Sequence, residues 1–397
     1  MNFDFEGKLI QPSEKFDLFW RFTTARHEID VKRRAGLQPP WTDDPVLETG
    51  RFCNVYRILD RASQYLVTDV IETGSQDFTE LIFRILLFTT FTKIDTWEVL
   101  RKSTNLTWAD YDRCLYERTL KDLHDRKITL YTGAYQKPAP DLGFSEAYLN
   151  HLTLLEKMME TLPDFLNTVR YAEDVFDWLC SFEGIGDFTA YQYFLNLSYS
   201  DVLNFSEDDF VVLGPGSRNG LQECFEDISP RASLAALRWM KATQRHHFKR
   251  LGLTFDGLGP SRLPMQLCDI EHTLCEFYKY LRSCNGGVQR SGRNFRSDMA
   301  PLLKPVRLPK AWDHADRQII RIRPPVEKYE VEEVVDHKWV GKSRMFQVYW
   351  VGYSVDEATW EPEQMLRRDA KLALEKYLQG IQEWSMPSTR PKKARRR

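Results

Sequence analysis

The spacing of apolar residues changes at about residue 325, and this change divides the chain into two folds. Before it, apolar residues recur every three or four positions, which is the period of an amphipathic α-helix. We expect helices at about residues 16–34, 52–61, 78–93, 97–100, 108–124, 146–164, 171–180, 189–197, 233–250 and 266–282. No convincing strand is expected there beyond short pieces such as 129–132. This part is therefore predicted to be all-α.

After residue 325 the apolar residues alternate with polar ones, first over 329–337 and again over 346–351. Such alternation is typical of half-buried strands. Residues 366–384 return to a helical period, so the C-terminal part is predicted to be a small α+β fold, a three-stranded antiparallel sheet with a C-terminal helix. The expected organisation is a helical domain at 14–284, a linker at 285–326, the β module at 327–384 and a tail at 385–397.

The expected linker contains several prolines, Gly286-Gly287 and nine Arg or Lys residues against three Asp. A basic tether can lie along DNA phosphates, a contact that is independent of sequence and sensitive to salt. A plain spacer fits the same composition. The tail is more basic still and ends in Arg390-Pro391-Lys392-Lys393-Ala394-Arg395-Arg396-Arg397. Such a run is either a nuclear-import signal or a solvated tail, and we expect a nuclear protein.

Composition sets further limits. Apolar residues make up 42% of the 397 residues and aromatic residues 13%, enough for a substantial core. Seven cysteines with no Cys-x-x-Cys pair favour a reducing compartment over a disulfide framework. Cys268, Cys275 and Cys284 lack metal-ligand spacing relative to His272, so neither a metal nor a cofactor is predicted. The apolar run 81–91 is too short to span a membrane, and no membrane partner is expected. The oligomeric state cannot be read from the sequence.

Two glycine turns are candidate nucleic-acid contacts. Gly184 and Gly186 lie between two expected helices, where glycine allows positive φ and a close approach of a ligand. The backbone N–H groups that open the second helix can then meet a phosphate. The second turn contains Gly214 and Gly216, is followed by Arg218, and comes directly after a pair of aspartates. Glycine turns are also common in helical proteins that bind no anion.

Two polar stripes have open interpretations. Asn54, Arg57 and Arg61 fall on one face of the helix expected at 52–61, and that face is either a charged surface or turned inward towards a site. The other stripe lies on the helix expected at 266–282 and consists of Asp269, His272, Glu276 and Lys279. It fits a surface ladder of salt bridges as well as a site.

The C-terminal module resembles a chromodomain. The resemblance rests on Tyr329-Glu330-Val331-Glu332, Val348-Tyr349-Trp350-Val351-Gly352-Tyr353 and Thr359-Trp360-Glu361-Pro362-Glu363. It implies that Tyr329, Trp350 and Tyr353 form an aromatic cage for a methylated lysine on a histone tail, with Glu357 beside it. Ring faces attract such a cation, by about 2 kcal/mol or more when it is desolvated. The same aromatic residues would otherwise belong to the core of the module.

Residues 14–284 resemble the helical domain associated with 5-hydroxymethyluracil DNA kinases and the α-glutamyl/putrescinyl thymine pyrophosphorylases, which is related to the helix-hairpin-helix DNA glycosylases. The matching blocks are Pro40-Trp41-Thr42, Phe52 to Arg61, Gly184-Ile185-Gly186, Gly214 to Gly220 and Asp269 to Lys279. The resemblance implies an all-helical domain that binds double-stranded DNA and modified pyrimidines. The phosphate-binding loop of a kinase is not found, since Asp336 stands where the first glycine of that motif would precede Gly341-Lys342-Ser343.

The resemblance also implies a mechanism. A carboxylate some 22 residues after the hairpin would support chemistry at the anomeric carbon, which points to Asp208 or Asp209 and slightly favours Asp209. Glu276 and Lys279 join them as candidate catalytic residues. Phe188 occupies the position of a Schiff-base lysine, so lyase chemistry is not expected there. Three functions remain open: a chromatin-targeted enzyme acting on modified bases, a reader of histones and DNA without catalysis, and a helical protein with no DNA role.

Overall fold

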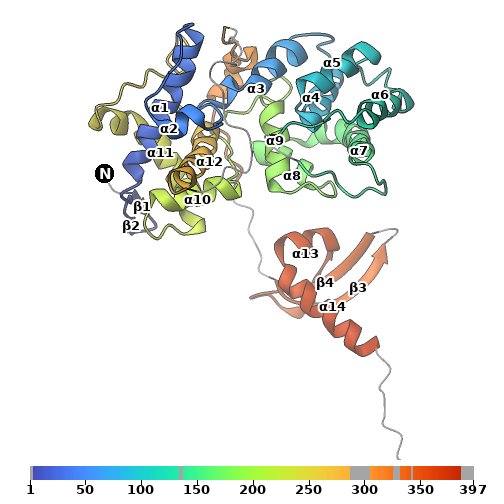
Figure 1. Ribbon diagram of the computed structural model, residues 1–397. Helices are drawn as coiled ribbons and strands as arrows, with labels where there is room; N and C mark the ends of the chain where they lie inside the picture. Colours follow the sequence, from blue (N-terminus) through green and yellow to red (C-terminus); the bar gives the residue numbers. More distant parts are fainter. Residues whose placement is uncertain (1–2, 134–136, 287–304, 325–330, 341–342, 386–397) are drawn as a thin grey trace, which may run out of the picture. The chain divides into compact units, whose positions relative to one another are not determined.

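The computed structural model describes residues 3–133, 137–286, 305–324, 331–340 and 343–385 (Figure 1). The chain forms two compact units, Met1–Arg323 and Pro324–Arg397. The first unit is predominantly helical, and the second contains a three-stranded sheet and two helices. The all-α and α+β folds expected from the two hydrophobic periods are both confirmed.

The first unit begins with a two-stranded hairpin, β1 (Phe3–Phe5) and β2 (Lys8–Ile10), which the sequence did not predict. Its longer helices are α1 (Phe16–Arg34), α4 (Phe78–Phe91), α5 (Ile94–Ser103), α6 (Arg113–Asp125), α7 (Ala147–Thr168), α8 (Ala172–Cys180), α9 (Asp187–Leu197), α10 (Pro215–Cys224), α11 (Ser233–Arg250) and α12 (Leu267–Cys284). Shorter elements are α2 (Pro45–Thr49), α3 (Arg61–Tyr65), the 3₁₀ turns at Arg57–Leu59 and Pro230–Ala232, and a π-helical turn at Leu66–Ile71. Residues 129–132 form no strand.

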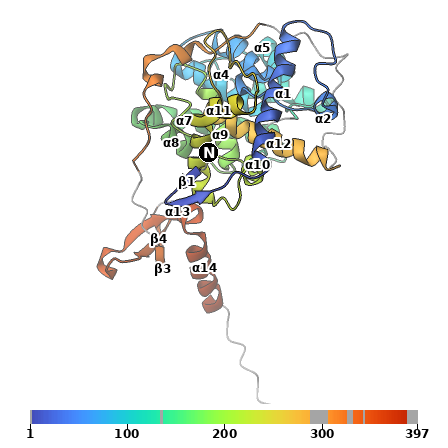
Figure 2. The same cartoon turned by 90° about the vertical axis from the view of Figure 1, so that its left-hand side faces the viewer.

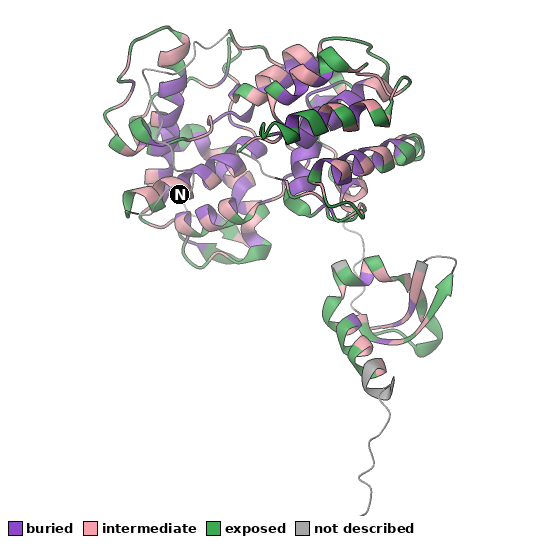
Figure 3. Cartoon of the chain, turned by 45° about the vertical axis from the view of Figure 1, so that its right-hand side comes forward, coloured by how far each residue is buried: buried purple, intermediate pink, exposed green. Residues whose placement is uncertain are grey.

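The helices pack in two groups. One group contains α1, α2, α10, α11 and α12, and α12 contacts each of the others (Figure 1). The other contains α4 to α9, with α4 packed on α5, α7 and α9. Figure 2 shows the same helices from the side. One continuous apolar core joins the groups, and buried residues line the helices where they face one another (Figure 3).

The apolar run at 81–91 forms the buried part of α4. Arg84, the one charged residue within it, is 3% exposed and directs its guanidinium to the backbone carbonyls of Val70, Thr73 and Ser75. These acceptors compensate for the loss of water around a buried cation. Within the described residues, no helix has both the length and the apolar composition that crossing a membrane requires.

The helix expected at 52–61 does not form. Residues 51–56 are extended, a 3₁₀ turn follows, and α3 begins only at Arg61. The reason lies in the backbone N–H groups, which donate to carboxylates instead of to carbonyls four residues earlier. Cys53 N–H donates to Glu276 (2.9 Å), and Asn54 N–H donates to Asp60 (2.9 Å). The helix predicted from the spacing of apolar residues is therefore wrong here, because side-chain carboxylates, and not backbone carbonyls, accept these hydrogen bonds.

Residues 305–323, part of the stretch with linker composition, belong to the first unit, and we call this segment the strap. It contains 3₁₀ turns at Lys310–Asp313 and Ala315–Gln318. Arg317 is 6% exposed and donates to the carbonyls of Ser198, Ser200 and Leu203. Arg323 forms an ion pair with Asp177 at 2.7 Å. A basic composition here reflects cations that fasten the strap to carbonyl and carboxylate groups.

The second unit has the strand order β3 (Val331–Val340), β4 (Ser343–Trp350), β5 (Thr359–Pro362), with both pairs antiparallel. A 3₁₀ turn at Val355–Glu357 precedes β5. The helix expected at 366–384 is broken at Ala370 into α13 (Glu363–Asp369) and α14 (Lys371–Ser385). The small core consists of Val334, Phe346, Val348, Leu366 and Leu374.

Candidate functional site

Helix α12 organises the polar interior of the first unit through three carboxylates that accept backbone N–H groups. Asp269 accepts from Arg57 at 3.0 Å, Glu271 from Gly214 at 3.1 Å, and Glu276 from Cys53 at 2.9 Å. Asp269 and Glu276 are 5% and 9% exposed, and His272 between them is 6% exposed. The stripe that included Asp269, His272 and Glu276 is therefore no surface ladder of salt bridges. It faces inward, towards residues 51–60.

The first glycine turn joins α8 to α9. Gly184 has φ of 76°, and a Cβ placed on it would lie 2.6 Å from the Cβ of Pro140. Gly186 is the N-cap of α9, and a Cβ placed on it would meet nothing within 4 Å. The N-terminus of α9 has no side-chain cap. Gly184 is thus required by the turn and its packing, whereas the space beside Gly186 is open.

The second glycine turn opens α10, and its glycines have a packing role. A Cβ on Gly216 would lie 2.4 Å from Cys275 Sγ, and one on Gly220 would lie 2.1 Å from the carbonyl oxygen of Leu274. Both contacts are with α12, so the glycines allow α10 to approach it closely. Glu271 also accepts a hydrogen bond from the Ser217 hydroxyl. A carboxylate therefore already caps α10, the helix whose N-terminus was expected to bind phosphate. Arg218 is exposed and forms no ion pair with a described residue.

The two glycine turns meet in space. The Phe188 ring lies against the N-terminus of α10, 3.6 Å from where a Cβ of Gly214 would stand. Phe188 is nevertheless 39% exposed. The fold therefore places an exposed aromatic ring between the N-termini of α9 and α10.

The two aspartates have different environments. Asp208 forms an ion pair with Lys241, and its side chain is 17% exposed. Asp209 is 1% exposed, and its two oxygens accept the N–H groups of Ser206 (3.0 Å) and Arg321 (2.8 Å). Burial raises the pKa of Asp209. The geometry gives Asp209 the task of holding the strap, so Asp208 is the better placed of the two to meet a ligand.

Glu276, Lys279 and Asn54 hold residues 51–60 in place. Lys279 forms an ion pair with Glu276 at 3.1 Å and also donates to the Arg51 carbonyl. The Asn54 side chain accepts from Arg26 (2.8 Å) and donates to the Leu59 carbonyl (2.9 Å). No hydrogen bond or ion pair among the described residues joins Glu276 and Lys279 to the aspartate pair. Glu276 and Lys279 instead contact residues 51–53, and Asp208 contacts Lys241.

A cluster of buried acids lies close to Asp208 instead. Burial, then the charges of Asp269 and Asp208, raise the pKa of Glu207 to about 8, although Arg317 opposes this shift. Burial likewise raises the pKa of Asp269 to about 7. Cys268 Sγ lies 3.6 Å from Glu207 Oε2. Acidic groups that lie too close together to ionise at the same time are common in active sites, and they also occur in purely structural clusters.

Arg57 is the residue of the first polar stripe that does turn inward. It is 5% exposed and donates to the Gln192 side chain at 2.6 Å. Arg57 lines a small cavity, of about 10 Å³, which suffices for roughly one water molecule. The other lining residues are Ala62, Ser63, Phe88, Thr92, Lys137, Gln192 and Asn196.

Lys137 is the second cation of this cavity. Its ammonium donates to the Thr92 hydroxyl at 2.9 Å. Burial, assisted by the Arg57 charge, lowers the pKa of Lys137 to about 7. The lining contains two cations, two amides and two hydroxyls but no carboxylate. Sequence reasoning missed Lys137, Gln192 and Asn196 because no local motif connects them.

In the second unit, Trp350 and Tyr353 lie at the end of β4 in a turn closed by the Tyr353 N–H and the Trp350 carbonyl (3.1 Å). Tyr353 is 46% exposed, and Trp350 is partly buried with its Nε1 donating to Thr359 (2.9 Å). Glu357 is exposed and accepts the Ser354 N–H at 2.9 Å. Tyr329 lies outside the described residues. Trp350 is thus shared between core and surface, and Tyr353 is a surface residue.

Together these features define a multidomain protein. A helical domain with buried polar groups inside its apolar core is joined to a small sheet module with aromatic residues at one edge. The chain belongs to the family of the 5-hmdU DNA kinase helical domain, whose model matches residues 13–290. The model of the Chromo (chromatin organisation modifier) domain matches residues 329–379. The resemblances to the 5-hmdU DNA kinase helical domain and to the chromodomain are both confirmed.

Two curated proteins are similar to parts of this chain. The 5-hmdU DNA kinase of Bacillus phage SP10 is 23% identical over 320 residues, which is 73% of this chain and 50% of the phage protein. The Chromo domain-containing protein cec-3 of Caenorhabditis elegans is 38% identical over 55 residues, 14% of this chain and 16% of the nematode protein. The chain thus spans half the length of the first relative and less of the second. No solved structure matches the chain significantly.

The two family assignments suggest roles related to chromatin and to DNA modification. The Chromo domain suggests an association with chromatin in particular.

Proposed function

We propose that this is a nuclear, chromatin-associated protein whose Chromo domain binds a methylated lysine on a histone tail and whose helical domain binds modified pyrimidines in double-stranded DNA. The observation that carries the DNA part is the meeting of the two glycine turns at Phe188. The exposed ring of Phe188 offers a base a stacking partner, and the N-terminus of α9, which has no side-chain cap, offers a neighbouring phosphate N–H groups and a helix dipole. Arg218 adds an exposed cation on α10.

The cavity beside Arg57 supports recognition of a pyrimidine. A pyrimidine edge presents carbonyl acceptors and a ring N–H, and cations with amide side chains are suited to these groups. The base must leave the DNA stack to reach the cavity. Because the cavity holds only about one water, a ring enters only when the side chains that line it move apart.

The DNA part is tested by fluorescence anisotropy with two duplexes that differ only in carrying 5-hydroxymethyluracil or thymine at one position. Phe188→Ala should weaken binding of both duplexes roughly 10-fold or more, the loss of one base stacked on an aromatic ring. Phe78→Ala is the matched control, since Phe78 is 53% exposed on another helix. Equal affinity of the two variants would remove Phe188 from the interface.

Base recognition is tested in the same assay with Lys137→Met. We expect this variant to lose the preference for 5-hydroxymethyluracil while it retains salt-dependent binding to DNA. Lys157→Met, a change of an exposed lysine on α7, should keep the preference. If wild-type protein binds the two duplexes equally well, the cavity does not read the base.

The histone part is tested by titrating the full chain with trimethyl-lysine and unmodified histone-tail peptides. Trp350→Ala should weaken binding of the methylated peptide about 30-fold or more, since a desolvated cation–π contact contributes about 2 kcal/mol. Trp339→Ala is the control, because Trp339 is 65% exposed on β3 of the same unit. Unchanged affinity of the Trp350 variant would exclude the cage.

A second candidate function is catalysis on the modified base, favoured by the clustered carboxyls of Glu207, Asp208 and Asp269. A carboxyl that stays protonated near neutral pH can act as a general acid, and a neighbouring carboxylate can stabilise a developing positive charge on the sugar. Mass spectrometry of the duplexes after incubation decides between the two functions. Release or exchange of the base would establish an enzyme, and intact DNA with binding retained would leave a reader.

A further inference from the structure

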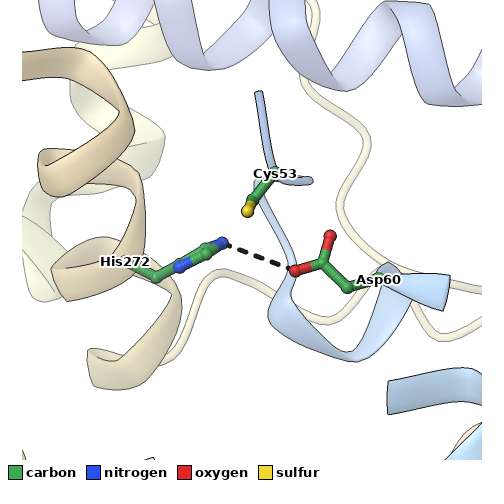
Figure 4. A group of neighbouring side chains, drawn as sticks. All are labelled: Cys53, Asp60 and His272. Atoms are coloured by element: carbon green, nitrogen blue, oxygen red, sulfur yellow. Dashed lines mark ion pairs between the residues drawn. The ribbon is translucent and has the colours of Figure 1, made fainter. Parts of the chain in front are cut away.

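Three side chains outside the cavity and outside the aromatic edge converge in the first unit. Cys53 belongs to the extended segment 51–56, Asp60 immediately precedes α3, and His272 lies on α12 (Figure 4). One ligand-type atom from each residue lies within 4.8 Å of the other two. His272 Nε2 and Asp60 Oδ2 are 3.8 Å apart, which is too long for a hydrogen bond.

We propose that Cys53, Asp60 and His272 bind a zinc ion. With zinc bonds of about 2.3 Å to sulfur and about 2.0–2.1 Å to nitrogen or oxygen, tetrahedral ligands stand roughly 3.3–3.6 Å apart. The separation of 3.8 Å between His272 and Asp60 is slightly longer than those values, and the other two separations are within 4.8 Å. A thiolate and an imidazole select zinc over magnesium and calcium, which prefer oxygen ligands. Three protein ligands leave the fourth position for water or a substrate atom.

The surroundings already hold the ligands in this arrangement. The His272 ring hydrogen-bonds the backbone of Asn54, and Asp60 Oδ1 accepts the Asn54 N–H at 2.9 Å. The Cys53 N–H donates to Glu276 at 2.9 Å. Such partners fix the orientation of metal ligands, and changing them typically costs 10- to 100-fold in affinity.

The charges around His272 are of both signs. Arg57 and Lys279 face His272 with positive charge, and Glu276 faces it with negative charge. The bound ion would fasten segment 51–60 to α12, where Asp269 and Glu276 already hold the same segment by hydrogen bonds.

The test uses the full chain, stripped with chelator and titrated with Co²⁺, which substitutes for zinc and is coloured. We expect one equivalent to bind and to produce the near-ultraviolet charge-transfer absorption of a cobalt–thiolate bond, which one equivalent of Zn²⁺ then abolishes. Mass spectrometry of alkylated cysteines provides a reading without any mutation. Zn²⁺ should protect Cys53 from iodoacetamide while Cys114 and Cys284, both exposed, react as before.

Variants complete the experiment. Cys53→Ser and Asp60→Asn should each weaken Zn²⁺ binding roughly 100-fold or more, at or beyond the upper end of the effect of changing a supporting residue. Cys114→Ser, on the surface of α6, should bind Zn²⁺ like wild type. Circular dichroism establishes that each variant is folded. Two results would each overturn the proposal: no thiolate band with wild-type protein, or alkylation of Cys53 at the same rate with and without Zn²⁺. The three side chains would then be neighbours that bind no metal.

Discussion

Gly216 and Gly220 allow α10 to approach α12 closely, and alanine at either position tests how tightly the two helices are packed. The methyl group of Gly220→Ala would lie 2.1 Å from the Leu274 carbonyl oxygen, where contact distances begin above 3.0 Å. The obstacle is backbone and cannot rotate away, so α10 must move by about 1 Å. Overpacking of this kind costs roughly 1–3 kcal/mol, sometimes more, against a gain of up to about 1 kcal/mol from better helix propensity.

The shift also disturbs the cap of α10. Glu271 on α12 accepts the Gly214 N–H at 3.1 Å and the Ser217 hydroxyl, and losing a buried hydrogen bond costs about 1–3 kcal/mol. We therefore expect Gly220→Ala to lower the free energy of unfolding by about 2–4 kcal/mol. Urea unfolding of the full chain, followed by far-ultraviolet circular dichroism and tryptophan fluorescence, measures this loss. An unchanged midpoint would refute the packing argument.

Gly216 provides a contrast within the same helix. Its methyl group would lie 2.4 Å from Cys275 Sγ but 3.4 Å from Cys275 Cβ, so removing the sulfur removes the clash. Gly216→Ala should destabilise the protein by about 1–2 kcal/mol, and adding Cys275→Ala should restore most of that loss. Gly380→Ala, where a Cβ meets nothing within 4 Å, controls for the substitution itself. If the double variant regains stability but not DNA binding, Gly216 contacts DNA as well.

Three further predictions concern the buried charges. The pKa of Glu207 is raised to about 8, so its protonated form stabilises the fold and this contribution is lost as pH rises from about 4.5 to about 8; Glu207→Gln should flatten the urea midpoint over that range, and an unchanged slope would contradict the assignment. The pKa of Lys137 is lowered to about 7, so the wild-type protein should gain stability between about pH 7 and pH 10.5, a gain that Lys137→Met should lack in the same measurement. Asp209→Ala removes the acceptor of the Ser206 and Arg321 N–H groups, costs about 2–3 kcal/mol, and should speed proteolysis within the strap; a strap cleaved at the wild-type rate would argue against this role.

The parts of the structure that follow from local pattern were predictable. The apolar run of α4 predicts a buried element, and the alternation of apolar and polar residues in β3 and β4 predicts half-buried strands. Trp350 and Tyr353 were predictable as neighbours, since the end of a strand and the turn after it place them together. The sequence does not predict how far each ring is buried, because this burial depends on packing against Thr359 and against the core of the second unit.

Residues 51–60 show why other parts were not predictable. The segment has a helical pattern, yet its N–H groups find acceptors on α12, more than 200 residues away. The same distance separates Cys53 from His272, so no spacing rule for metal ligands could have joined them. Tertiary contacts outweigh local propensity here because a buried carboxylate without donors is more costly than an unformed helical turn.

The role of α12 changes what the family resemblance says about function. The blocks that carry it include residues 52–61, 214–220 and 269–279, and in the fold the first two donate backbone N–H groups to the carboxylates of the third. Residues bound to one another in this way account for the architecture, and their presence supports the fold more strongly than any reaction. A function must depend on groups that the architecture leaves accessible or strained. Under the proposed function those are Phe188 and Arg218 on the surface, and Arg57 and Lys137 at a cavity whose lining contains no carboxylate. Substitutions at Phe188 and Lys137, which lie outside these blocks, separate loss of function from loss of fold.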